Sequence, residues 1–373
     1  MSDLLTLRKQ FPVTENYIYF NHAAVSPLPR CSADAMRAQI SDVEQNGVHG
    51  FGRWMADYDG LRTAAANMIH CSAGEIAITK NTSEGLSAVA NGLDWKANDV
   101  VVCLEDDFPA NFMPWRELQG RRGVRLRRLE MVRGSLDLNQ IDAACEGARL
   151  LALSYVHFLT GFRLDLNAVG EICRRRNCIF VVDAVQGMGP FPIDVKQAGI
   201  HALSASGHKW LLGPEGCAVF YIDADLMPQV EPVEFGWTNT QGFENYQRDG
   251  ELRIDAGRYE CGTLNSVGSA GMRASIELLN EIGSEWASAR INSLVERFLA
   301  GAEQKGYASA AKRTAATGSG VVSIRKDGVD SVATVEMLLE NRISAAPRFG
   351  WIRVAPHVYN TTDEIDQLIK LLP

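Results

Sequence analysis

Two polar residues close apolar runs of strand length in the middle of the chain. The run Ile179–Val182 ends in Asp183, and the run Ala202–Ala205 leads within a few residues to Lys209. Ligands of mostly parallel sheets bind just beyond the carboxyl ends of the strands. Either residue alone is explained as simply by a helix cap or a surface lysine. The pair, placed at two strand ends, favours one shared site that holds a carboxylate and an amine.

The chemistry that suits this pair is a lysine Schiff base to pyridoxal 5'-phosphate (PLP). PLP needs an amine to hold it and an acid to keep its ring nitrogen protonated, so that the ring can accept electrons from a substrate. Lys209 would supply the amine and Asp183 the carboxylate. Gln186 could donate a hydrogen bond to the phenolic oxygen of the ring. Ser206 and His208 flank the lysine and are candidates for holding the phosphate.

These stretches resemble a known family. The segments SASGHKWLLGPEGCAVFY (204–221) and VVDAVQGMG (181–189) are similar to the lysine and aspartate motifs of class V aminotransferases. That group contains PLP enzymes of fold type I, among them cysteine desulfurases, isopenicillin N epimerase-like proteins and kynureninases. The resemblance implies an α/β fold with a large, mostly parallel sheet covered by helices and a smaller C-terminal α/β domain. The lysine motif is specific for PLP and says little about the reaction.

The remaining sequence pattern agrees with such a fold. Short apolar runs alternate with amphipathic helical segments, which indicates βαβ units and a parallel sheet covered on both faces. The expected strands include 76–79, 100–104, 124–129 and 150–155, and the expected helices include 2–10, 30–46, 54–69, 138–145 and 165–176. We expect a large PLP-binding domain over 14–282 and a small domain over 283–373, with residues 1–13 packed on the small domain.

Two further strand ends carry candidate cofactor residues. Thr82 begins a helical segment after the strand 76–79 and is a good N-cap. A helix N-terminus suits a phosphate, and the resemblance places the phosphate loop on Thr82 and Ser83, although a plain capped helix explains the local pattern equally well. Phe108 follows the strand 100–104, where the family has a ring stacked on PLP. A phenyl ring stacks well but carries no proton, and a core aromatic is the alternative.

Candidate substrate residues lie in loops and in the C-terminal part. Arg353 stands in an apolar strand, where a charge is costly without an anionic partner. Its planar fork suits a carboxylate, and the resemblance assigns it the α-carboxylate of the substrate, with Arg348 as a weaker alternative. His22 and His157 lie in loops expected near the site. A packed loop histidine explains each of them as well.

The resemblance also predicts a homodimer. Thr263 aligns with a threonine that reaches across the family's dimer interface to the PLP phosphate of the neighbouring site. The alternative role for Thr263 is to cap the helix expected over 266–279.

The reaction is less well defined by the sequence than the cofactor. Desulfurases of this family attack sulfur with a cysteine in the loop before the terminal arginine motif. Here no cysteine follows Cys261, and the segment 344–350 has no thiol, so desulfuration is disfavoured. We expect chemistry at the amino group or Cα of an amino acid or amine, of the aminotransferase type. A PLP-dependent C–S or C–C lyase, an epimerase and a PLP-binding protein without turnover are the alternatives.

Composition sets the outer limits. The chain has 373 residues, 46% of them hydrophobic, which is enough for a sizeable core. A net charge of −8 argues against nucleic-acid or anionic-membrane binding. The basic run 121–128 is explained by a solvated helix end that leads into an edge strand. Eight cysteines without a C-x-x-C pair predict reduced, buried thiols in a cytoplasmic protein and no metal site. No apolar run has membrane length.

Overall fold

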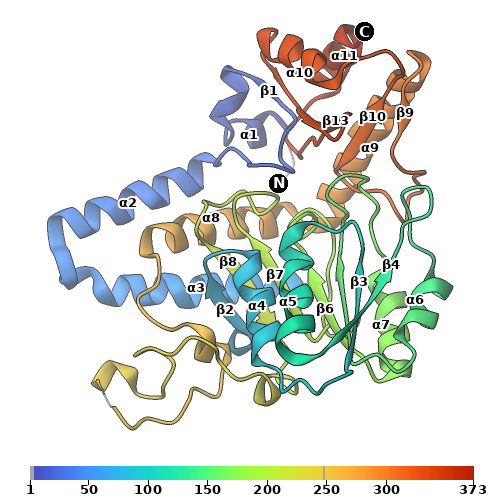
Figure 1. Ribbon diagram of the computed structural model, residues 1–373. Helices are drawn as coiled ribbons and strands as arrows, with labels where there is room; N and C mark the ends of the chain where they lie inside the picture. Colours follow the sequence, from blue (N-terminus) through green and yellow to red (C-terminus); the bar gives the residue numbers. More distant parts are fainter. Residues whose placement is uncertain (1–3, 247) are drawn as a thin grey trace.

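A seven-stranded sheet forms the centre of the computed structural model, which describes residues 4–246 and 248–373 (Figure 1). The strands lie in the order β2-β8-β7-β6-β5-β3-β4. Only β8 runs against its two neighbours. The strands are β2 (Ile76–Thr79), β3 (Val100–Leu104), β4 (Arg125–Leu129), β5 (Leu150–Ser154), β6 (Ile179–Asp183), β7 (Ala202–Ser206) and β8 (Ala218–Ile222). The predicted mostly parallel sheet is therefore confirmed.

Helices cover both faces of this sheet, because its strands are apolar on both sides. Along β3, Val100 and Val102 belong to one buried apolar cluster, whereas Val101 and Cys103 belong to the other, as the alternation of side chains requires. The first face is covered by α3 (Phe51–Ile69), α6 (Leu138–Cys145), α7 (Leu166–Arg176) and α8 (Ser266–Ile282), and the second by α4 (Thr82–Gly92) and α5 (Met113–Arg122). Helix α2 (Arg30–Asn46) packs on α8.

The C-terminal part forms a second layer (Figure 1). Its antiparallel sheet has the order β12-β13-β10-β9. Its elements are α9 (Ser284–Gln304), β9 (Ala308–Ser309), β10 (Val322–Arg325), α10 (Ser331–Glu340), β11 (Ile343–Ser344), β12 (Ala346–Arg348), β13 (Trp351–Val354) and α11 (Thr362–Leu371). One apolar cluster runs from the first face of the large sheet into α9 and β10. The division at residue 283 stays a prediction.

The N-terminal segment packs on this second layer. Strand β1 (Ile18–Tyr19) pairs in parallel with β11. The ring of Phe11 stacks on that of Tyr359, with 4.0 Å between the ring centroids. Helix α1 (Leu4–Arg8) is shorter than the expected helix 2–10, because Pro12 opens a separate 3₁₀ turn; residues 2 and 3 lie outside the described part of the chain.

Two other sequence expectations concern element ends and membrane spans. Helix α3 begins at Phe51, three residues before the expected start, because residues 47–50 form a 3₁₀ turn that runs into it. Helix α5 ends at Arg122 and the edge strand β4 begins at Arg125, so the basic run is an exposed helix end as expected. Over 4–246 and 248–373, no helix is both long enough and apolar enough to cross a bilayer.

Candidate active site

Asp183 is the last residue of β6 and is almost completely buried. Its Oδ1 accepts a hydrogen bond of 3.0 Å from the backbone N–H of Val185. Its Oδ2 is buried without a hydrogen-bond partner among the described residues. Burial, with a contribution from the nearby charge of Asp107, raises the pKa of Asp183 to about 7. Within the described part of the chain, this buried carboxylate oxygen therefore has neither a hydrogen-bond donor nor an ion-pair partner.

Lys209 lies three residues beyond the end of β7, in the turn that leads to β8. Its Nζ lies 5.2 Å from the centroid of the Phe108 ring. Burial lowers the pKa of Lys209 to about 8, against the opposing charge of Asp183 and with help from Arg353. A lysine with a lowered pKa is partly neutral near pH 7, and only the neutral amine can act as a nucleophile or a base.

A cavity of about 470 Å³ brings these groups together. Nine of the residues that the sequence predicts line this cavity: Thr82, Ser83, Phe108, Asp183, Gln186, Ser206, His208, Lys209 and Arg353. The cavity opens at the carboxyl ends of β6 and β7, where ligands of parallel sheets were expected to bind.

Two hydroxyl groups join the end of β7 to the start of α4. The Oγ atoms of Thr82 and Ser206 lie 2.9 Å apart, and the Thr82 N–H donates to Ser206 Oγ at 2.8 Å. The predicted N-cap was wrong by one residue: Asn81 caps the helix, with its Oδ1 accepting from the Glu84 N–H at 3.0 Å. The Thr82 hydroxyl therefore does not cap α4 and lies with Ser83 at the positive end of its dipole, a position that suits an anion.

Gln186 is held by two hydrogen bonds on the cavity wall. Its Nε2 donates to the backbone oxygen of Ala23 at 3.0 Å. Its Oε1 accepts from the indole N–H of the buried Trp210 at 2.8 Å. An amide nitrogen carries two hydrogens, so one remains for a ligand. His208 also lines the cavity, and burial lowers its pKa.

Arg353 lies on β13 at the other side of the cavity and is 3% exposed. Its Nη1 donates to the backbone oxygen of Phe158 at 3.0 Å. No ion pair joins it to a carboxylate of the described residues, and its Nε has no hydrogen-bond partner there. Burial and the neighbouring Arg348, which also lines the cavity, lower the pKa of Arg353 to about 10. Among the described residues, no carboxylate therefore neutralises this buried guanidinium.

Three predicted residues do not line the cavity. The His22 ring is fully buried, with Nδ1 2.7 Å from the Ala355 oxygen and Nε2 2.7 Å from the Tyr359 hydroxyl. The His157 ring lies between Thr160 Oγ1 and the Asp106 oxygen, at 3.1 and 3.0 Å. Both therefore fit the alternative of a packed loop histidine.

Thr263, the third of these residues, borders a separate small pocket. That pocket measures about 90 Å³ and also contacts Trp237 and Glu260. Within one chain, Thr263 is thus not part of the Lys209 cavity.

Sequence patterns missed three side chains of the site. Phe158 and Phe349 line the cavity, with 6.4 Å between their ring centroids. Asp107 is a buried carboxylate that accepts from the Phe108 N–H at 2.8 Å and from the Ser154 hydroxyl at 2.6 Å. It fixes the loop that carries Phe108. An acidic residue three positions after the buried strand β3 was the one available signal for Asp107.

Comparison with known proteins identifies the family of the chain. Residues 18–368 match the model of the class-V aminotransferases, a family of PLP-dependent enzymes, and the chain belongs to this family. It is similar to a probable cysteine desulfurase of Pyrococcus abyssi, with 30% identity over 98% of this chain and 96% of that protein. It is also similar to the uncharacterized aminotransferase YcbU of Bacillus subtilis, with 28% identity over 97% of this chain and 95% of that protein.

Solved structures confirm the expected fold type. The apo structure of a cysteine desulfurase from Thermococcus onnurineus has a TM-score of 0.93 and 28% identity, with 100% of this chain and 97% of the other covered. The cystine C–S lyase C-DES, in complex with its product cysteine persulfide, has a TM-score of 0.90 and 26% identity, with 97% and 99% covered. Another structure of C-DES has glycine covalently linked to the PLP cofactor.

Proposed function

We propose that the protein is a PLP-dependent lyase that cleaves the C–S bond of cystine or a related α-amino acid. One observation carries this proposal: the cavity offers a lysine, an acid and an arginine, but no cysteine is among its lining residues. The strands β12 and β13 are joined by the two-residue turn Phe349–Gly350, which has no room for a loop bearing a nucleophilic thiol. A lyase of this class needs no enzyme thiol, and C-DES provides a structural precedent.

The residues at the cavity fit PLP. The unpartnered Asp183 Oδ2 would accept from the protonated ring nitrogen, and Lys209 would hold the aldehyde carbon. The hydroxyls of Thr82 and Ser206 would hold the phosphate, and Phe108 would lie against the ring. PLP, when bound, supplies an electron sink for the pair of electrons left at Cα after proton removal.

The protein's own groups account for the other requirements of the reaction. Arg353 would bind the substrate carboxylate with two hydrogen bonds and so orient Cα. Once the substrate amine had replaced it on the cofactor, the free Lys209, with its pKa of about 8, would accept the Cα proton as general base. The Cβ–S bond then breaks, sulfur leaves with the bonding electrons as a thiol or persulfide, and hydrolysis of the three-carbon remainder gives pyruvate and ammonia.

Transamination, which the sequence favoured, receives less support than C–S cleavage. The relatives and structures above carry the names of desulfurases and a C–S lyase more often than that of an aminotransferase. Because Lys209 and Asp183 would serve either reaction, only the products separate them.

Product analysis with cystine tests this proposal. Purified enzyme with PLP should form pyruvate and ammonia in equal amounts, together with cysteine persulfide. Alanine as the carbon product would identify a desulfurase instead, and keto acid that forms only with an amino acceptor and without ammonia would identify a transaminase. Lys209→Ala should abolish turnover, whereas Lys312→Ala, at an exposed lysine, should not.

The predicted homodimer also remains a proposal. Thr263 is held away from its own cavity, so it would serve the site of a second copy. Trp237, which borders the same small pocket as Thr263, is 43% exposed, and Phe235, two residues before it, is 70% exposed, which supports burial by a partner. Sedimentation equilibrium measures the assembly. A monomer at micromolar concentration, or a Thr263→Ala variant with unchanged PLP affinity, would contradict this part of the proposal.

A further inference from the structure

Three cysteines that are far apart in the sequence meet behind the large sheet. Cys145 ends α6, Cys173 lies in α7 and Cys178 directly precedes β6. Their sulfur atoms all lie within 4.8 Å of one another. Their side chains are 0%, 1% and 3% exposed, respectively.

The spacing of these residues hid the cluster in the sequence. A structural metal site is usually recognised from two cysteines a few residues apart in each half of the site. Here only Cys173 and Cys178 are close in sequence, and the packing of α6 against α7 brings in Cys145. The expectation that the chain has no metal site was based on the missing C-x-x-C pair, which this geometry does not need.

The sulfur positions are close to those of a metal-thiolate centre. Three sulfurs bonded to one ion at about 2.3 Å lie roughly 4 Å apart. The cluster therefore needs to contract by less than about 1 Å. Turning side chains about χ1 within a close-packed core achieves shifts of that size without moving the helices.

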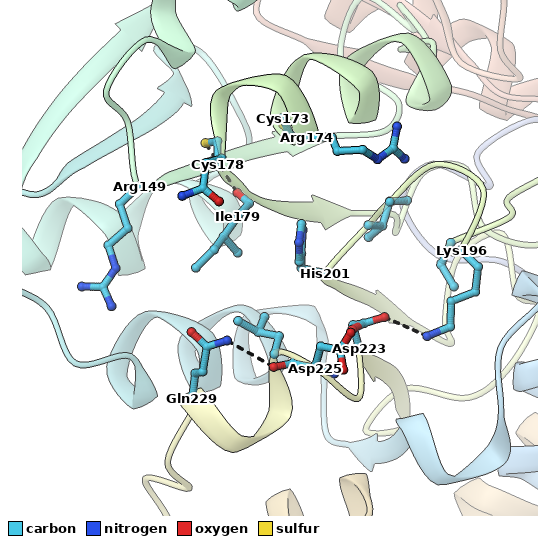
Figure 2. Close-up of a pocket in the computed structure, with 15 residues that line it drawn as sticks. Arg149, Cys173, Arg174, Cys178, Ile179, Lys196, His201, Asp223, Asp225 and Gln229 are labelled. Carbon is cyan, nitrogen blue, oxygen red and sulfur yellow. Dashed lines mark hydrogen bonds and ion pairs between the residues drawn. The ribbon is translucent and has the colours of Figure 1, made fainter.

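The surroundings provide access and compensating charge. Cys173 and Cys178 line a cleft of about 590 Å³ (Figure 2), which is larger than the Lys209 cavity. The cleft lies at the amino ends of β5, β6 and β7. The guanidinium of Arg127 is fixed beside Cys145 by a bond of 2.8 Å to the Glu146 oxygen. A nearby cation lowers the cost of burying thiolates.

The ligand set indicates which kind of ion would bind. Thiolates select soft ions such as monovalent copper and zinc. Zinc in structural sites almost always takes four protein ligands. His201 lines the cleft, but its Nδ1 accepts from the Phe180 N–H at 3.0 Å, so the ring proton lies on Nε2 and neither nitrogen has a free lone pair for a metal. The cluster found among the described residues has three members.

We propose that Cys145, Cys173 and Cys178 form a buried three-sulfur site for a soft metal ion, monovalent copper in preference to zinc. Each thiol gives up its proton on binding, and the metal keeps its oxidation state. The site is separate from the Lys209 cavity. That cavity lies at the carboxyl ends of the strands and the cysteine cluster near their amino ends, one strand length or about 16 Å away.

Anaerobic titration with monovalent copper tests the proposal. The holoenzyme is first treated with iodoacetamide, which caps the partly exposed Cys31, Cys71 and Cys261. It is then titrated against a chromophoric copper chelator. One equivalent should be withheld from the chelator, and X-ray absorption of that copper should show three sulfur neighbours and no nitrogen. These measurements use the wild-type protein, so they do not require any variant to fold.

Matched variants locate the site. Cys145→Ala and Cys178→Ala should each lose the withheld equivalent, whereas Cys103→Ala and Cys217→Ala, at buried thiols outside the cluster, should retain it. Failure of the wild type to withhold copper, coordination by nitrogen, equal retention in all four variants, or displacement of the copper by equimolar zinc would each overturn the proposal. PLP content and lyase activity should be the same with and without copper, so the result of this test does not depend on the proposed function.

Discussion

Replacing Asp183 by asparagine should change stability in a way that depends on pH. In the cofactor-free protein, burial raises the pKa of this carboxyl from 3.8 to about 7. A raised folded-state pKa means that the folded protein binds the proton more tightly than the unfolded chain does. Its contribution to stability is therefore fully present below about pH 4 and is lost as the pH rises to about 7. Asparagine stays neutral and escapes this loss.

The size of the effect follows from the pKa difference. One pH unit in this window corresponds to about 1.4 kcal/mol. Between pH 5 and pH 7, the wild type should therefore lose about 2–3 kcal/mol of unfolding free energy relative to Asp183→Asn. Urea unfolding of both cofactor-free proteins at pH 5, 6 and 7 measures this difference. The exposed Asp249→Asn provides the matched loss of one carboxylate.

Bound PLP should reverse the order of stability of the wild type and Asp183→Asn. A protonated ring nitrogen beside Asp183 favours the ionised carboxylate, so saturating PLP at pH 8 should stabilise the wild type more than Asp183→Asn. A difference between the cofactor-free proteins that does not change from pH 5 to 7 would refute the buried-carboxylate argument. Equal stabilisation of both by PLP would refute its pairing with the ring.

Other substitutions test the substrate side and the loop behind it. Arg353→Lys should raise KM for cystine by about tenfold to a hundredfold with little change in kcat, because one ammonium cannot replace the two hydrogen bonds of a guanidinium. Steady-state kinetics measures this, with cystamine, which has no carboxylate, as the control substrate. An equal rise in KM for cystamine would contradict the role of Arg353. Gly161→Ala should lower the unfolding free energy by about 3 kcal/mol in urea, since Gly161 has φ +71° and an added Cβ would meet the Val321 oxygen at 1.8 Å. An unchanged urea midpoint for Gly161→Ala would show that the loop can move away from β10.

The sequence brought the proposed cofactor residues to one cavity because they lie at or near strand ends. Parallel strands bring their carboxyl termini to one edge, so Asp183 and Lys209 could be placed together from two apolar runs alone. The same reasoning placed Phe108 and Ser206 at the cavity. Local patterns were sufficient for these four side chains because each lies at a strand end or within four residues of one.

Side chains in loops could not be placed in this way. His22 does not line the cavity because its ring is hydrogen-bonded in the core, between the Ala355 oxygen and the hydroxyl of Tyr359, more than 300 residues later. Phe158 lines the cavity although its neighbour His157 does not. The cysteine cluster could not be predicted from the sequence either. Its third member, Cys145, comes from α6, and the packing of α6 on α7 cannot be inferred from the spacing of the cysteines.

The attachment of the cofactor to one amine can be measured directly. Holoenzyme reduced with borohydride should carry a stable pyridoxyl group, which peptide mapping by mass spectrometry assigns to a residue. The group is expected on the peptide that contains Lys209, at one per chain, and on no peptide from Lys209→Ala. A preparation that binds no PLP, or one that carries the group on another lysine, would contradict the central claim.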